Sequence, residues 1–183
     1  MKTIVQLLII SVLISNKSFG QLYATQAGET SFFSETPVEN IIAVNKTVGA
    51  IINTTTNEVV VSMKMTAFEF PNKLMQEHFN ENYMESEKYP TGTFKGKIVE
   101  PIDYTKNGTY DVTAKGQLSI HGVSVPRDLK GKLTIENQKI SLISNFDVKL
   151  VDHKIDVPKI VFAKIAEVIS VKIKYAFSPY VKK

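Results

Sequence analysis

Residues 110–120 read Tyr-Asp-Val-Thr-Ala-Lys-Gly-Gln-Leu-Ser-Ile, so apolar or small residues alternate strictly with polar ones. Successive side chains of a β-strand point to opposite faces, and a period of two over this length is typical of a long strand with one dry face and one wet face. The same alternation returns further along the chain, at 57–65, 93–98, 129–135, 140–150 and 169–177. We therefore predict a set of strands around an apolar interior, and we look for function in that interior.

Other segments have less regular patterns. Residues 22–35 are expected to form two short strands around a turn. The apolar runs 39–45 and 49–53 are expected to form a hairpin whose turn is 45–47. His121-Gly122 and Asn137-Gln138 are expected to be turns between longer strands. Residues 151–167 have no clear period, and Pro158 breaks any helix through them.

One segment, 71–86, has a helical period. Met75, Phe79 and Tyr83 recur every four residues, and Glu77, Glu81 and Glu85 do the same on the opposite side. This spacing predicts an amphipathic helix of about four turns, with Pro71 in its first turn and the glutamates in solvent. The three apolar side chains are expected either to plug one end of the fold or to form a lid beside a ligand entrance.

About eight mostly antiparallel strands and one helix make an all-β fold. Because each long strand has one apolar face, the sheet must pack on another sheet or close on itself, and we predict an eight-stranded antiparallel β-barrel. Gly96, Gly116 and Gly131 fall on the inward positions of three strands. We interpret them as positions that leave the lumen open, and the alternative is that they permit strand bends or bulges.

The N-terminus has the pattern of a secretory signal peptide. Lys2 precedes an apolar run from Ile4 to Ile14, and small residues lie before Gln21. The run is shorter than the roughly 20 residues that a membrane-spanning helix needs. We therefore predict a signal peptide at 1–20, cleaved near Gly20 and Gln21, and one domain at 21–183 in the periplasm or outside the cell.

Composition excludes several classes of function. The chain has no cysteine, which excludes disulfides, thiolate metal sites and a cysteine nucleophile. Its net charge is +4, and removal of Lys2 and Lys17 with the leader lowers it by two, to +2. Arg127 is the one arginine, and no basic run is interleaved with aromatic residues, so we expect no nucleic-acid partner.

Two segments carry a resemblance to a known family. Residues 86–90 read Ser-Glu-Lys-Tyr-Pro, with Phe94 and Gly96 after them, and residues 116–123 read Gly-Gln-Leu-Ser-Ile-His-Gly-Val. Their order and spacing resemble the two signatures of the YceI-like family, and the likeness runs over about residues 21–180. The chain departs from the family pattern at 38–52, which has no histidine where members often carry one.

The resemblance implies an exported bacterial protein with a lipocalin-like barrel around an apolar tunnel. The best-understood members bind a polyisoprenoid chain, such as a quinone tail, in that tunnel. We therefore expect a lipid-binding protein that holds a polyisoprenoid or fatty chain as carrier, store or sensor, with no cofactor other than such a lipid. The alternative is a ligand-free barrel that acts as a protein interaction module. No transmembrane segment is expected in the mature chain, and a homodimer is left open.

From the alternation we expect fourteen residues to line the tunnel. They are Val61, Met63, Phe94, Tyr110, Val112, Ala114, Gly116, Leu118, Leu133, Leu142, Phe146, Val171, Ile173 and Tyr175. Met75, Phe79 and Tyr83 are the candidates for a lid.

Neither metal binding nor catalysis is predicted. His78, His121 and His153 are far apart in sequence, whereas a zinc site needs three or four ligands close together. His121 is expected to hold a turn by hydrogen bonding, and His78 to lie at a contact between helix and sheet. No nucleophile motif, phosphate loop or dinucleotide fingerprint occurs.

Asp152 and Asp156 flank His153 and form the best catalytic candidate, although a surface loop is the simpler interpretation. An enzyme that acts on lipid inside the barrel would need this cluster to face the lumen.

Overall fold

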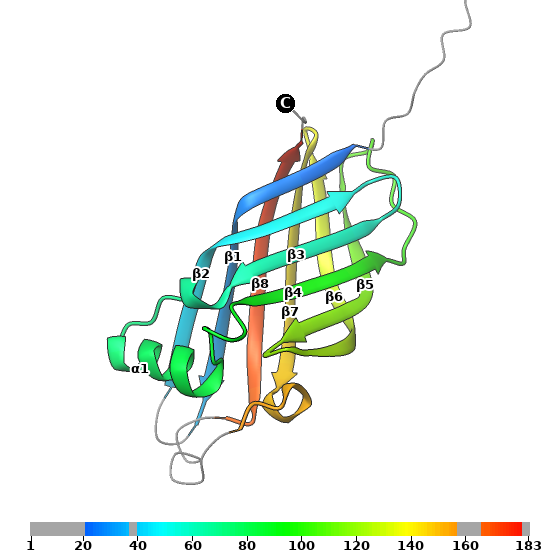
Figure 1. Cartoon of the computed structure of the whole chain (residues 1–183). Helices are drawn as coiled ribbons and strands as arrows, with labels where there is room; N and C mark the ends of the chain where they lie inside the picture. The colour runs from blue at the N-terminus through cyan, green and yellow to red at the C-terminus, as the bar shows by residue number, and fades with distance from the viewer. Residues whose placement is uncertain (1–20, 37–39, 157–165, 181–183) are drawn as a thin grey trace, which may run out of the picture.

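The computed structural model describes residues 21–36, 40–156 and 166–180. The expected leader at 1–20 lies outside these ranges, as does part of the segment 151–167. Within them the strands close into a barrel in which each strand pairs with the next and the last pairs with the first (Figure 1). The strands are β1 Leu22–Glu35, β2 Asn40–Asn53, β3 Glu58–Lys64, β4 Thr91–Ile98, β5 Gly108–Ile120, β6 Val123–Glu136, β7 Lys139–Lys149 and β8 Val168–Pro179. The prediction of an antiparallel eight-stranded barrel is confirmed.

The first two strands are longer than predicted. β1 is one strand of 14 residues rather than two short ones, because register shifts on both sides of Gly28 reset the alternation without ending the strand. β2 is also one strand of 14 residues, not a hairpin. Asn45 resembles a turn residue in the sequence but is buried within the strand. Its side chain donates to the Lys64 carbonyl at 3.0 Å and accepts from the Thr47 amide at 2.9 Å.

The predicted turns at His121-Gly122 and Asn137-Gln138 are confirmed. In both turns the two central residues have positive φ, 51° and 71° in the first and 49° and 60° in the second. Two residues in this conformation match the right-handed twist of the flanking strands and give a tight hairpin. Both long hairpins, β5–β6 and β6–β7, are therefore set by local turn geometry.

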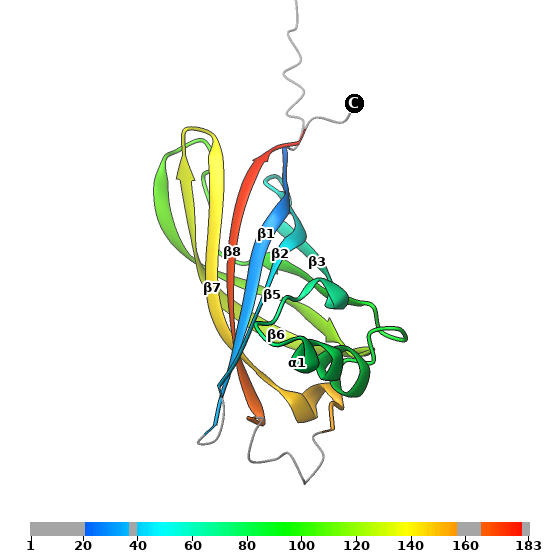
Figure 2. The same cartoon turned by 90° about the vertical axis from the view of Figure 1, so that its left-hand side faces the viewer.

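The predicted helix is present but shorter, and its second half is wider. α1 spans Lys73–His78 and continues as a π-helix, η2, at Phe79–Tyr83. Pro71 lies before the helix rather than in its first turn, because Asn72 is the N-cap and accepts from the Leu74 amide at 2.9 Å. Glu77, Glu81 and Glu85 are exposed, as predicted. The helix lies beside one end of the barrel (Figure 2), which we call the helix end.

Two short 3-10 helices, η1 Met65–Ala67 and η3 Leu150–His153, complete the described elements. The interior divides into two apolar clusters. The larger fills the part of the barrel away from the helix, where Ile52, Leu133, Ile140 and Phe177 are at most 1% exposed. The smaller joins η1 and the segment around the helix to β2 through Ala43, Met65, Phe68, Met84 and Ile155. No helix in the described ranges has the length and apolar character to cross a bilayer.

Candidate functional site

An apolar cavity, which we call the main cavity, lies at the helix end of the barrel. It has a volume of about 400 Å³ and is partly open to solvent. Its wall combines side chains of α1 and η2 with inward-facing residues of the strands. The lining residues are Thr30, Phe32, Ser34, Ile41, Met63, Met65, Phe68, Phe70, Asn72, Leu74, Met75, His78, Phe79, Tyr83, Met84, Gly92, Thr93, Leu118, Ile120, Phe146, Val148, Leu150, Ile155, Ile169 and Val171.

Four phenylalanines hold the helix against the strands at this cavity. The ring of Phe79 lies 5.5 Å from Phe32, 5.7 Å from Phe68 and 5.1 Å from Phe70. Aromatic pairs at such distances contribute about 0.5–1.5 kcal/mol each beyond the area they bury. The cluster thus fixes the helix over the cavity while presenting only carbon to it.

A second, smaller cavity of about 60 Å³ lies deeper in the barrel. It shares Thr30, Met63, Leu118 and Phe146 with the main cavity, so these four residues mark the junction between the two. The rest of its wall is Val59, Val61, Phe94, Ile98, Val112, Ala114, Leu129, Gly131, Leu142, Ser144, Ile173 and Tyr175. Beyond it, the larger apolar cluster closes the barrel.

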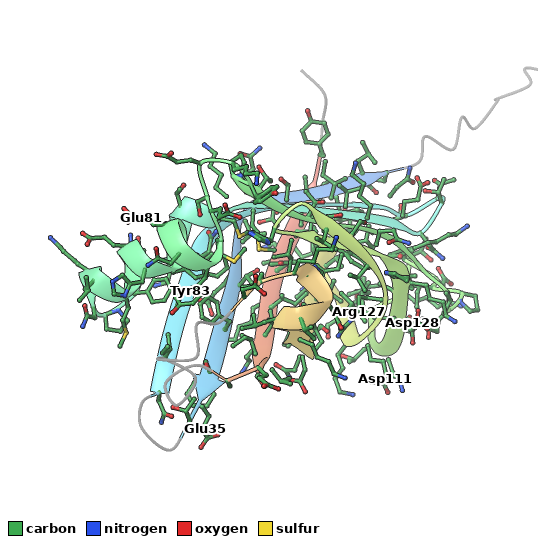
Figure 3. The ribbon with its side chains drawn as sticks, turned by 60° about the horizontal axis from the view of Figure 1, so that its bottom comes forward. Glu35, Glu81, Tyr83, Asp111, Arg127 and Asp128 are labelled. Atoms are coloured by element: carbon green, nitrogen blue, oxygen red, sulfur yellow. The ribbon has the colours of Figure 1, made fainter. Side chains whose placement is uncertain are left out.

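Neither cavity has a Lys, Arg, Asp or Glu side chain among its described lining residues. The charged pairs are exposed on the outside of the barrel, for example Lys115 with Asp128 at 3.2 Å and Lys132 with Asp111 at 2.7 Å. Figure 3 views the helix end and shows Arg127 and Asp128 on the side of the barrel away from Tyr83. A buried charge without a partner is costly, so this site suits an uncharged guest.

The structure places most of the fourteen predicted lining residues around the two cavities. Met63, Leu118 and Phe146 line both, and Val171 lines the main one. Seven line only the smaller cavity: Val61, Phe94, Val112, Ala114, Leu142, Ile173 and Tyr175. Tyr110, Gly116 and Leu133 line neither. The three lid candidates, Met75, Phe79 and Tyr83, all line the main cavity.

The three inward glycines each lie close to the backbone of a neighbouring strand. A Cβ at Gly116 would lie 2.2 Å from the Lys95 carbonyl oxygen, and one at Gly131 would lie 2.6 Å from that of Ile143. At Gly96 it would meet the Lys115 carbonyl oxygen at 2.7 Å. The space beside each glycine is therefore taken by a neighbouring strand. For Gly96 and Gly116 the interpretation as open lumen is wrong, and the alternative of strand bends with close backbone approach fits the geometry. Gly131 combines a close neighbouring strand with a place in the wall of the smaller cavity.

Most residues that line the main cavity are not among the residues predicted from the alternation. Phe32, Met65, Phe68, Phe70 and Met84 are five of these. Phe68 and Phe70 alternate immediately before the helix, which was a usable signal for an apolar wall leading into a lid. The cavity is accordingly nearer to the helix than the predicted lining implied.

The three histidines occupy separate environments. His121 holds its turn, as predicted: Nε2 lies 2.7 Å from Oε2 of Glu85, and Nδ1 lies 3.2 Å from the carbonyl oxygen of His153. His78 is exposed and is among the residues that line the main cavity, whose wall the helix and the strands form together. No group of three metal-ligating side chains occurs among the described residues.

His153 is not on a surface loop. Its side chain is 0% exposed, and its Nδ1 lies 3.2 Å from the Val123 carbonyl oxygen. Burial lowers the pKa of the imidazole below its usual value of 6.5. His153 lines neither cavity, and Asp152 and Asp156 are exposed. The three side chains therefore do not form a cluster toward the lumen.

The two sequence signatures meet in space at the helix end. The ring of Tyr89 packs edge-on against His121 with 4.6 Å between centroids, and a Cβ at Gly122 would lie 2.5 Å from the Tyr89 ring. The YceI-like domain family matches residues 23–177, which include both signatures. The chain belongs to the YceI-like family.

Solved structures with the same fold agree with this assignment. A polyisoprenoid binding domain from Saccharophagus degradans, implicated in plant cell wall breakdown, has a TM-score of 0.73 at 12% identity, over 88% of this chain and 99% of that one. BcnA of Burkholderia cenocepacia has a TM-score of 0.67 at 12% identity, over 82% and 96%. The YceI protein of Campylobacter jejuni has a TM-score of 0.63 at 20% identity, over 81% and 90%. Among curated proteins, none matches the sequence.

Proposed function

We propose that this YceI-like protein binds a long apolar chain, polyisoprenoid or fatty, with part of the chain inside the barrel. The observation that carries the proposal is the cavity of about 400 Å³ at the helix end, partly open to solvent and free of Lys, Arg, Asp and Glu among its described lining residues. The solved neighbour from Saccharophagus degradans, described as a polyisoprenoid binding domain, supports the same ligand class. The chemistry is binding without catalysis.

The size of the cavity bears on how much of the chain is held. Ligand sites usually measure about 300–1,000 Å³, so this one is at the small end. Each buried CH₂ contributes about 0.8 kcal/mol, and a five-carbon isoprene unit contributes roughly 3–4 kcal/mol before ordering costs. A few isoprene units inside the barrel therefore provide enough free energy for binding. The rest of a longer chain extends out of the cavity.

The leader-like segment at 1–20 supports export to the periplasm or beyond. The proposed ligand there is an isoprenoid quinone or another lipid, and the protein acts as its carrier, store or sensor. A homodimer is compatible with each of these roles.

The first test is native mass spectrometry of the mature protein purified from a bacterial periplasm, with organic extraction of what co-purifies. A stoichiometric isoprenoid or fatty species supports the proposal and identifies the class of chain. A clean apo mass that stays unchanged after incubation with quinones and lipids contradicts it. That result would favour the alternative, a barrel that acts as a protein interaction module.

A matched pair of variants links uptake to this cavity. Val171→Phe adds bulk to the wall of the main cavity, whereas Val60→Phe makes the same change at an exposed position on β3. We expect Val171→Phe to reduce lipid uptake at least severalfold and Val60→Phe to leave it unchanged. Circular dichroism melts check that both variants fold. Equal uptake by both would place the lipid elsewhere.

A further inference from the structure

Resting on the proposed binding of an apolar chain, we infer that the Thr30–Tyr175 hydroxyl pair receives an uncharged oxygen carried by the chain end that enters the barrel first. The ligand class is thereby narrowed to neutral oxygen-bearing chains, such as long-chain alcohols, ketones or quinones. Hydrocarbons without oxygen and ionised fatty acids fit the site less well.

The pair lies where the two cavities meet. Thr30 lines both of them and Tyr175 lines the deeper one, so a chain that fills the main cavity from its open side reaches the pair at its leading end. Both side chains are 2% exposed, and their surroundings are apolar. The hydroxyl pair is therefore placed to form a hydrogen bond with an oxygen atom at that end of the chain.

The hydrogen-bond count leaves one donor free. Thr30 Oγ1 and Tyr175 Oη lie 2.8 Å apart, and either can donate to the other. Two hydroxyls have two hydrogens, and this bond uses only one. The hydroxyl of Ser144, which also lines the deeper cavity, donates to the Lys130 carbonyl. Among the described residues the second O–H of the pair has no acceptor, and a buried donor without a partner is costly.

The phenol remains a neutral donor, since burial raises the pKa of Tyr175 to about 12. Neither cavity offers a Lys or Arg side chain among its described lining residues, so an ionised carboxylate at this depth would lack a counter-charge. A carbonyl or hydroxyl oxygen is uncharged, and the one free O–H of the pair can donate a hydrogen bond to it.

The local backbone is shaped to hold the tyrosine ring in this position. Gly28 in β1 leaves the space that the ring occupies, and a Cβ there would lie 2.6 Å from Cδ1 of Tyr175. Phe177 packs edge-on to the same ring at 6.2 Å. The bulge at Gly28 and the hydroxyl pair are thus one arrangement, in which β1 contributes both the space for the ring and the partner of its hydroxyl.

The test compares farnesol with farnesene, a fifteen-carbon hydrocarbon without the hydroxyl. Affinities are read from displacement of the neutral dye N-phenyl-1-naphthylamine and from native mass spectrometry. We expect wild-type protein to prefer farnesol by about three- to tenfold, the effect of one neutral hydrogen bond. The double variant Thr30→Val/Tyr175→Phe removes both hydroxyls and should abolish most of this preference, whereas each single variant keeps one hydroxyl whose hydrogen is free and should retain part of it. Farnesoic acid, ionised at pH 7.5, should bind no tighter than farnesene.

The control is Tyr23→Phe, which removes a phenol hydroxyl from β1 at the far end, where that hydroxyl contacts Gln21. It should keep the full preference for farnesol. Equal affinity of wild type for farnesol and farnesene would overturn the inference while leaving apolar binding intact, as would a full preference for farnesol in the double variant Thr30→Val/Tyr175→Phe. A wild type that binds neither probe would overturn the proposed function itself.

Discussion

Gly96 of β4 and Gly116 of β5 face each other across the sheet, and a Cβ at Gly116 would lie 2.4 Å from the Cα of Gly96 and 2.2 Å from the Lys95 carbonyl oxygen. Two glycines in register allow the strands to approach more closely than any side chain permits. The ring of Phe94 also borders Gly96. The space beside both glycines is therefore filled by neighbouring backbone and this ring.

Gly116→Ala should lower the free energy of unfolding by about 2 kcal/mol, since the methyl group can be accommodated only by moving backbone. Gly49→Ala is the matched control, because its Cβ would have the Ser62 carbonyl oxygen as nearest neighbour at 3.7 Å, an ordinary contact. We expect that change to stay within about 0.5 kcal/mol of wild type. Urea denaturation of both variants measures the difference. Equal stabilities would show that the strands separate at little cost.

The sequence predicted most strands because alternation survives wherever one face is buried, and β3 to β8 follow it closely. It misread β1 and β2 for two physical reasons. A bulge at Gly28 breaks the period without breaking the strand, and Asn45 is a turn-like residue whose polar groups are satisfied inside the sheet. Neither bulges nor side-chain hydrogen bonds are visible in a hydropathy pattern.

His121 links the hairpin β5–β6 to the segment after the helix through Glu85 and to η3 through the His153 carbonyl. Replacing it with alanine removes both contacts, which help to hold the backbone of this turn at a φ of 51°. We expect His121→Ala to cost about 2 kcal/mol of stability. The exposed His78→Ala should change stability by less than about 0.5 kcal/mol. Thermal melts of the two variants measure these losses of stability. Similar losses in both would contradict the role assigned to His121.

Phe79 is the centre of the aromatic cluster that attaches the helix to the strands. Phe79→Ala should cost about 2 kcal/mol, less than a fully buried phenylalanine, and the loss should fall mainly on the helix. Hydrogen exchange then speeds up in residues 73–83 while β5 to β7 keep their protection. Glu81→Ala, on the exposed side of η2, should leave both unchanged. Faster exchange throughout the barrel would mean that the helix does not open separately.

The position of the cavity was the part of the site that the sequence could not give. Alternation shows which side chains face inward, but it does not show how far along the barrel axis they are packed. Leu118 and Leu133 each lie near the C-terminal end of a strand, but β5 and β6 are antiparallel, so the two side chains lie toward opposite ends of the barrel. Leu118 lines both cavities, whereas Leu133 is 0% exposed in the closed part. Alternation does not show which end of the barrel is hollow.

The buried His153 should make stability fall as the solution becomes acidic. Burial lowers the pKa of this imidazole in the folded state below the value of about 6.5 in the unfolded chain. Below pH 6.5 the unfolded chain therefore binds a proton that the folded one does not. Stability is complete above that pH and declines as pH falls toward the folded pKa, by at most about 1.4 kcal/mol per pH unit.

His153→Asn provides the comparison, because the asparagine amide keeps a donor toward the Val123 carbonyl and does not titrate. Urea denaturation at pH 7.5 and pH 5.0 should show a larger acid-induced loss in wild type than in the variant. The other histidines and the carboxylates are common to both proteins, so the difference between the two losses belongs to His153. Parallel losses would mean that His153 takes up its proton as readily in the folded barrel as in the unfolded chain.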